Sequence, residues 1–174
     1  ADVSLDHFVY EKSPLGNWTM NGVYLPGDNN AHHVDGFIMH NDQEIMYMNG
    51  IYQTDETEKE NITGELELQH FPLWVINPFI PDRMVDFRGD IDGTLAMEGN
   101  PLKPVLNGGL QLDSVLMVMP DMSIGFRFDN KKVKMQDSKM VFDKFNIYTR
   151  GETPFVVNGS VDFSDLEKMM VDLR

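Results

Sequence analysis

The longest regular pattern in the chain is the alternation of apolar or glycine residues with polar or small ones over Val85–Gly99, VDFRGDIDGTLAMEG. A two-residue period is typical of a strand with one apolar face and one solvated face. At about 3.3 Å per residue, the fifteen residues span about 50 Å. A compact domain of this length has a diameter of about 40 Å. The pattern therefore predicts an elongated sheet, and the function of its apolar face becomes the central question.

The dipeptide Asp92-Gly93 inside this pattern also suits a two-residue hairpin turn. Such a turn would place Leu95 on the face opposite Phe87 and divide the apolar set between two faces. A continuous strand keeps the set together and is the prediction. The same reasoning predicts a continuous strand through Asn158-Gly159, whereas at Asn21-Gly22 a hairpin and a continuous strand both stay open.

The rest of the chain shows further strand patterns with little helical signal. We predict strands at Val3–Tyr10, Trp18–Tyr24, Val34–Met39, Ile45–Tyr52, Ile62–Leu68, Leu106–Val118, Ile124–Phe128, Val133–Met135, Met140–Phe142, Phe145–Ile147, Phe155–Phe163 and Met169–Leu173. Polar pieces at 129–132, 136–139 and 143–144 have the length of hairpin loops, and 55–60 is a charged loop. The fold class is therefore all-β, with an antiparallel sheet. Glycines recur at strand positions, where they allow a sheet to bend: Gly50, Gly64, Gly89, Gly108 and Gly159.

The most apolar stretch, residues 70–81, interrupts the strand pattern. Pro72 suits the first turn of a helix and Pro78 is expected to end it, which leaves about two turns over Leu73–Asn77. A helix this short is not stable alone and cannot span a bilayer. We expect it to lie across an apolar surface, where it either caps one end of the sheet or sits in the fold of the sheet. Its apolar residues are Leu73, Trp74, Ile76 and Phe79.

Composition limits the functional classes. The 174 residues suit one domain with a sizeable core, and the net charge of −14 disfavours nucleic acid and anionic membrane surfaces as partners. No cysteine is present, so disulfides and thiol chemistry are excluded. No run approaches the roughly 20 apolar residues of a membrane helix. The chain starts at Ala1 without an initiator Met and ends on a strand pattern, so we interpret it as a piece of a longer protein.

Candidate catalytic and metal-binding chemistry is weak. Asp86, Asp90 and Asp92 share one strand face, but carboxylates on a solvated face lack the apolar pocket that would raise a pKa. His32 and His33 are adjacent and point to opposite faces of an extended chain. No nucleophile elbow, phosphate loop or dinucleotide motif occurs. We therefore predict a non-enzymatic protein without catalytic residues, metal or cofactor.

Methionine is abundant, with thirteen residues in the chain. Its flexible, polarizable side chain suits a surface that accepts varied apolar partners, although ordinary core filling would use the same residue.

Residues 64–163 resemble the C-terminal region of TamB-type subunits of the translocation and assembly module, within the AsmA-like family. The resemblance is carried by the order and spacing of the motifs GELEL from Gly64, FPL from Phe71, NPF from Asn77, GDIDGTLAMEG over Gly89–Gly99, PVLNG from Pro104 and FVVNGSVDF over Phe155–Phe163. The first 60 residues match less clearly.

The resemblance implies a sheet folded along its length like a taco shell (a β-taco) around an apolar trough, with residues 1–174 forming one segment of it. It implies a protein anchored in the inner membrane of a diderm bacterium that crosses the periplasm, moves phospholipid to the outer membrane and assists outer-membrane protein assembly with a TamA-type β-barrel. Acyl chains would then lie in a trough whose expected lining is Leu66, Leu68, Val85, Phe87, Ile91, Leu95, Met97, Leu110, Leu112, Leu116, Ile124, Phe126, Phe128, Phe142, Val157, Val161 and Phe163.

Two other functions stay open at this point. A chaperone-like scaffold would receive strands of outer-membrane protein precursors at exposed sheet edges. A carbohydrate-binding β-sandwich would present aromatic rings in an open, polar groove.

Overall fold

The computed structural model describes residues 1–28, 30–54, 60–80, 84–149, 151, 153–165 and 170–174. The predicted charged loop at 55–60 therefore lies outside the described residues except for Glu60, and so do Pro81 and the predicted strand residue Met169.

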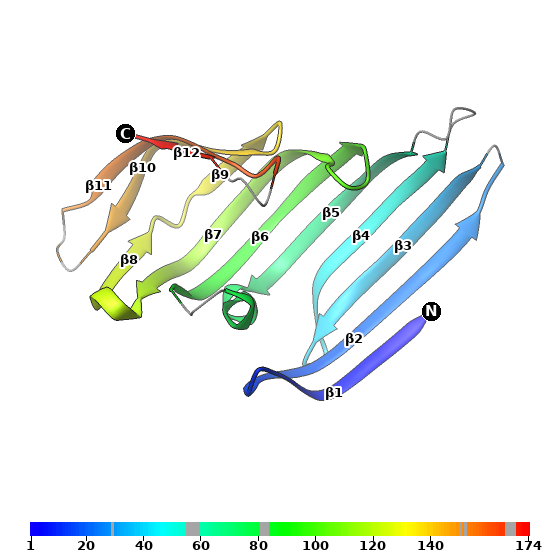
Figure 1. Cartoon of the computed structure of the whole chain (residues 1–174), viewed down its shortest axis with the longest axis horizontal. Helices are drawn as coiled ribbons and strands as arrows, with labels where there is room; N and C mark the ends of the chain where they lie inside the picture. Colours follow the sequence, from blue (N-terminus) through cyan, green and yellow to red (C-terminus); the bar gives the residue numbers. More distant parts are fainter. Residues whose placement is uncertain (29, 55–59, 81–83, 150, 152, 166–169) are drawn as a thin grey trace.

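The described residues form one 12-stranded antiparallel sheet and two short 3₁₀ helices, η1 (Leu73–Phe79) and η3 (Pro120–Met122). This confirms the predicted all-β class and antiparallel sheet, and Figure 1 shows the strands side by side. Sheet order follows chain order from β1 to β8 and then runs through β10, β11 and β12. The strands are β1 (Asp2–Tyr10), β2 (Ser13–Pro26), β3 (Ala31–His40), β4 (Gln43–Thr54), β5 (Glu60–Pro72), β6 (Asp86–Gly99), β7 (Val105–Met119), β8 (Ile124–Phe128), β9 (Lys132–Gln136), β10 (Lys139–Tyr148), β11 (Phe155–Asp162) and β12 (Met170–Leu173).

The Asp-Gly and Asn-Gly dipeptides lie inside strands. β6 runs unbroken through Asp92-Gly93 and β11 runs unbroken through Asn158-Gly159, as predicted. The undecided case, Asn21-Gly22, lies in the middle of β2, so the chain continues there without a turn.

Strands β8 and β9 together fill one position in the sheet, between β7 and β10. β8 pairs with the C-terminal part of β7 and β9 with its N-terminal part, and each also pairs with β10. The predicted hairpin loop at 129–132 is therefore wrong, because the two strands lie end to end and do not pair. The hairpin at 136–139 is confirmed, and its central residues Asp137 (φ 50°) and Ser138 (φ 61°) have the positive φ values of a type I′ turn.

Four strands that run in the same direction each contain one extra residue with left-handed backbone. The backbone N–H of this residue donates to a side-chain oxygen of a neighbouring segment, at 2.8 or 2.9 Å. The bulge residues and their acceptors are His7 with Asn17, His70 with Asp92, Ser114 with Asn130, and Lys144 with Asn158. Because each bulge shifts the side-chain alternation by one residue, apolar residues three apart share a face, as Phe142 and Phe145 do.

The bulge at Lys144 shows that the predicted hairpin loop at 143–144 is wrong. The register of β10 against β11 shifts between Phe142 and Phe145, and β10 continues to Tyr148. The polar pair at 143–144 is compatible with either a bulge or a turn. The bulge is favoured because it keeps Phe145 packed in the core, where its side chain is 3% exposed.

Asn158→Ala removes the acceptor of the Lys144 N–H and is expected to lower the free energy of unfolding by about 1 kcal/mol. Urea unfolding of the two proteins measures the difference. Ser160→Ala, on the same strand, is the control and should change stability by less than about 0.5 kcal/mol. Equal effects of the two substitutions would show that the bulge does not depend on Asn158.

The helix that follows β5 is a 3₁₀ helix, η1 (Leu73–Phe79). It extends beyond the predicted end and includes Pro78, because a proline removes only its own N–H and the next bond, from Ile80 N–H to Asn77 C=O, still forms. The Asn77 side chain holds η1 against β6: Nδ2 donates to Phe87 C=O at 2.9 Å, and Oδ1 accepts from Phe87 N–H at 2.7 Å.

The helix lies on the apolar face of the sheet, which we call the inner face. Leu73 packs there with Leu112, Val115, Val133 and Phe145 from β7, β9 and β10. A second buried cluster joins Leu95, Leu110 and Met135, with Leu66, Met140 and Phe163 against it. Both clusters lie in the C-terminal half of the sheet, which therefore holds most of the core.

Glycine is required where β6 and β7 approach each other most closely. A Cβ at Gly93 would lie 2.2 Å from the Gly109 carbonyl oxygen, and one at Gly108 would lie 2.1 Å from that of Thr94. Both glycines are on the inner face, opposite Leu110 and Leu95 in the register. They allow the sheet to bend at its centre.

The end of β11 is held by a buried carboxylate. The Ser164 hydroxyl and backbone N–H donate to Asp162, the backbone N–H to Oδ1 at 2.9 Å, and Lys139 Nζ lies 3.4 Å from Oδ2. These contacts lower the pKa of Asp162. A carboxyl whose pKa is lower in the folded state than in the unfolded chain stabilises the fold above its unfolded pKa of about 3.9. This stabilisation is lost as the pH falls through the folded pKa.

Asp162→Asn is therefore expected to reduce stability near pH 7 and to weaken the dependence of the unfolding free energy on pH below about pH 4. Urea unfolding at several pH values between neutral and acid measures both. Lys131 and the Asn146 N–H also lower the pKa of Asp129 against the effect of burial, so part of the acid sensitivity should persist in the variant. An unchanged pH profile would contradict the assigned role of Asp162.

Candidate functional site

Most residues of the predicted trough lining lie on the inner face of the C-terminal half. Leu95, Leu110 and Leu112 are at most 6% exposed and belong to the packed core. Ile124 is exposed, and the other lining residues are half-buried. The structure brings together Leu66, Leu68, Phe87, Ile91, Leu95, Leu110, Leu112, Phe128, Phe142 and Phe163 in or against the two buried clusters.

Leu116 does not lie on the inner face. The bulge at Ser114 adds one residue to β7 relative to β6, so Val115 shares a face with Leu112 while Leu116 pairs with Arg88 and Arg127. Strict alternation assigned Leu116 to the trough, and the bulge makes this assignment wrong.

The apolar inner face continues across β1–β5, where sequence reasoning named only Leu66 and Leu68. Cross-strand pairs carry it from Leu66 to Met48 and from Leu68 through Met46 and Ile38 to Met20 and Val3. Several of these side chains are solvent-exposed: Val3 is 49% exposed, Met20 41% and Met48 36%. The N-terminal half therefore presents an apolar face that the described residues leave largely uncovered.

A groove of about 300 Å³ lies on this exposed face. Its inner-face apolar side chains are Val3, Met20, Val34, Ile38, Met46 and Met48, and Gly22 and Gly36 lie beneath them. Ala1, Asn21, Asp35 and Phe37 also line it, the last three from outer-face register positions. We call it the N-terminal groove. Its volume is at the small end of the range for ligand sites, and large exposed apolar patches mark interaction surfaces.

One end of the N-terminal groove is closed by aromatic rings. Trp18 and His40 lie with ring centroids 4.9 Å apart, and Trp74 of η1 meets His40 edge-on at 5.5 Å. Trp18 Nε1 donates to the Leu15 carbonyl oxygen at 2.8 Å. Figure 1 shows η1 beside the ends of β5 and β6.

The opposite end of the groove carries three polar aromatic residues and one carboxylate, which we call the mouth cluster: Tyr24, His32, Tyr52 and Glu60. All four occupy inner-face register positions. Tyr24 Oη lies 2.5 Å from His32 Nδ1, and Tyr52 Oη donates to Glu60 Oε1 at 2.8 Å. The mouth cluster offers aromatic faces, hydroxyls and a carboxylate at the point where the apolar lining ends.

The opposite, outer face of the same strands is more polar. A hollow there is lined by Leu25 and Ile51 together with His33, Asp35, Asn49 and Glu65, and no Trp, Tyr or Phe lines it. Tyr47 Oη donates to Asp35 Oδ2 at 2.6 Å, which raises the pKa of Tyr47. The Tyr47–Asp35 pair is the outer-face counterpart of the Tyr52–Glu60 pair.

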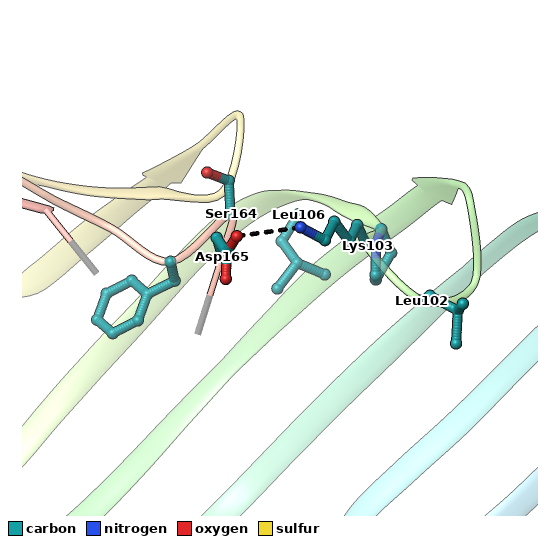
Figure 2. Close-up of a pocket in the computed structure, with 7 residues that line it drawn as sticks. Leu102, Lys103, Leu106, Ser164 and Asp165 are labelled. Carbon is teal, nitrogen blue, oxygen red and sulfur yellow. Dashed lines mark hydrogen bonds and ion pairs between the residues drawn. The ribbon is translucent and has the colours of Figure 1, made fainter. Parts of the chain in front are cut away.

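A second pocket, of about 400 Å³, lies where the chain after β11 crosses the loop between β6 and β7 (Figure 2). Lys103 Nζ lies 3.0 Å from Asp165 Oδ2, and this ion pair joins the two segments that line the pocket. Leu106 and Phe163, which also lines the pocket, pack against the second buried cluster. The inner face of the C-terminal half is therefore partly closed at this end.

The ionisable groups predicted to be solvated are at the surface or partly exposed. His70 Nδ1 lies 3.2 Å from Asp92 Oδ2 beside the β5 bulge. The expectation that nothing raises a carboxyl pKa on this strand face is wrong for Asp90, because burial raises the pKa of Asp90 against the opposing effect of His70. Within the described part of the chain no three His, Asp or Glu side chains are arranged to hold a metal ion. Among the same residues, no helix has the length and apolarity to cross a bilayer.

Comparison with protein-family models, curated proteins and solved structures found no match. The function must therefore be argued from the geometry of the sheet and its groove.

Proposed function

We propose that the protein is a non-enzymatic segment of a β-taco whose inner face binds the acyl chains of phospholipids. In this proposal the sheet folds lengthwise, its inner face forms an apolar trough, and head groups stay in solvent at the open side. The family resemblance of residues 64–163 motivates the setting: the periplasm of a diderm bacterium, a chain anchored in the inner membrane, and a TamA-type β-barrel in the outer membrane as partner.

The observation that carries the proposal is the uncovered N-terminal groove. Its lining is apolar and largely aliphatic, it is rich in methionine, and it continues the apolar face that the C-terminal half buries in its own core. Burying one acyl methylene contributes about 0.8 kcal/mol. Flexible methionines at Met20, Met46 and Met48 can adapt to chains of different shape.

Leu95 and Leu112 belong to the predicted trough lining but are unsuitable positions for a binding test. A charged residue at either position would destabilise the fold, because both side chains are buried in packed clusters. Substitutions at the exposed Met20 and Met48 can change lipid binding without destabilising the fold.

A photoactivatable fatty acid tests the proposal on the purified protein. The proposal predicts labelled peptides from β2, β3 and β4 that carry the adduct on inner-face residues such as Met20, Ile38 and Met48, with competition by unlabelled phospholipid. Labelling spread equally over outer-face residues such as Tyr47, or no labelling, would contradict it.

A scaffold for outer-membrane protein precursors is the second candidate, and the sheet edges favour it. β1 and β12 end the sheet order, so each has one edge without a partner strand among the described residues. Strand addition at such an edge would protect backbone amides of the edge strand. Hydrogen exchange of β1 with and without an unfolded barrel protein measures this, and unchanged exchange would contradict the scaffold role.

A further inference from the structure

The charge of the chain is concentrated in the half that holds the N-terminal groove. Residues 1–72 contain thirteen Asp and Glu but only two basic residues, Lys12 and Lys59, whereas residues 73–174 contain fifteen acidic and twelve basic residues. Lys59 lies outside the described residues, and Lys12 is in the turn between β1 and β2, away from the mouth cluster. This acidic half should therefore disfavour ligands that carry a net negative charge.

The groove also has a defined length. Its closed end is at Trp18 and its mouth is at Tyr24 on the same strand, so six residues of about 3.3 Å each give about 20 Å. One leaflet of a bilayer's hydrocarbon core is about 15 Å thick. The groove is therefore long enough for one extended acyl chain, with the head group of the same lipid at the mouth cluster.

The mouth cluster has the chemistry that recognises an ammonium group. Two tyrosine rings offer negative π-faces, and Glu60 supplies a carboxylate that Tyr52 positions by its hydrogen bond. Tyr24, stacked on His32 with ring centroids 5.4 Å apart, forms the other side of the cluster. Apart from His32, the described residues of this cluster include no group that can carry a positive charge.

We propose that the mouth cluster binds the ammonium of a zwitterionic phospholipid head group while one acyl chain of that lipid lies in the N-terminal groove. This inference rests on the proposed function and adds a head-group preference to it. Phosphatidylethanolamine should bind in preference to phosphatidylglycerol, because the two share a phosphate and differ in the ammonium.

Native mass spectrometry of the purified protein tests the preference, with equimolar dipalmitoyl phosphatidylethanolamine and dipalmitoyl phosphatidylglycerol in a neutral detergent. We expect about fivefold to tenfold more of the phosphatidylethanolamine adduct. Glu60→Gln should bring the ratio close to one and leave phosphatidylglycerol binding unchanged or stronger.

Asp35→Asn is the matched control. It removes one negative charge from a tyrosine-paired carboxylate of the same half, but on the outer face, so the ratio should stay at the wild-type value. Equal binding of both lipids to the wild type, or a preference that survives Glu60→Gln, would overturn the head-group site while the groove stands. Binding of neither lipid would overturn the groove itself and this inference with it.

Discussion

Met20→Glu should reduce acyl-chain binding at least tenfold while the protein stays folded. Met20 lies at the centre of the N-terminal groove and is 41% exposed, so its replacement removes little core packing. A bound acyl chain would remove water from the new carboxylate without providing a hydrogen-bonding partner. The free-energy cost of burying an unpaired charge exceeds the value of about 1.4 kcal/mol that corresponds to a tenfold loss of affinity.

The measurement is a titration of a fluorescent fatty acid into both proteins, with far-UV circular dichroism to confirm the fold. Thr19→Glu places the same charge on the adjacent residue of β2, whose side chain points to the outer face. This control should bind like the wild type. Equal loss of binding in both variants would indicate a general charge effect and contradict a groove at Met20.

Gly108→Ala should lower the free energy of unfolding by more than about 4 kcal/mol, which is exceptional for one methyl group. The new Cβ would lie 2.1 Å from the Thr94 carbonyl oxygen and 3.0 Å from the Leu95 Cα, both in the backbone of β6. Relief of this clash requires β6 and β7 to separate, at the place where Leu95 and Leu110 join the two strands in the second buried cluster. Since domains of this kind are stable by about 5–15 kcal/mol, a loss of this size removes about a quarter or more of the total stability.

Gly125→Ala is the matched control for this prediction. A Cβ at Gly125 meets only the flexible Leu116 Cδ1, at an ordinary 3.6 Å, so its effect should stay below about 1 kcal/mol. Urea unfolding of both variants gives the comparison. Similar stability of the two variants would show that the central bend of the sheet tolerates a side chain.

The strands were predictable from sequence because the two-residue period survives wherever one face is apolar and the other is solvated. β6 and β11 follow this rule over their full length, and the rule correctly rejected turns at their Asp-Gly and Asn-Gly dipeptides. It failed at the bulges. Positions 114 and 144 are Ser and Lys, which carry no signal for left-handed backbone, so Leu116 was assigned to the wrong face and β10 was divided in two.

The candidate site was only partly predictable for a different reason. The alternation of apolar residues is similar in β2–β4 and in β6–β10, so the sequence does not say which part of the face stays open. Which part of the inner face stays uncovered depends on the curvature of the sheet, because the curvature brings the C-terminal strands and η1 together over Leu112 and Val115. A signal that could have directed attention to Met20, Met46 and Met48 was the near absence of basic residues around them.

Site-specific photo-crosslinking in cells that make the protein tests whether the inner face of β1–β4 holds lipid. A photoreactive amino acid is placed at Met20 or, as the control, at the neighbouring outer-face position Thr19, and each adduct is identified by mass spectrometry. We expect phospholipid adducts at Met20 and none at Thr19. Protein adducts at Met20 in place of lipid, or the same lipid adducts at both positions, would contradict it.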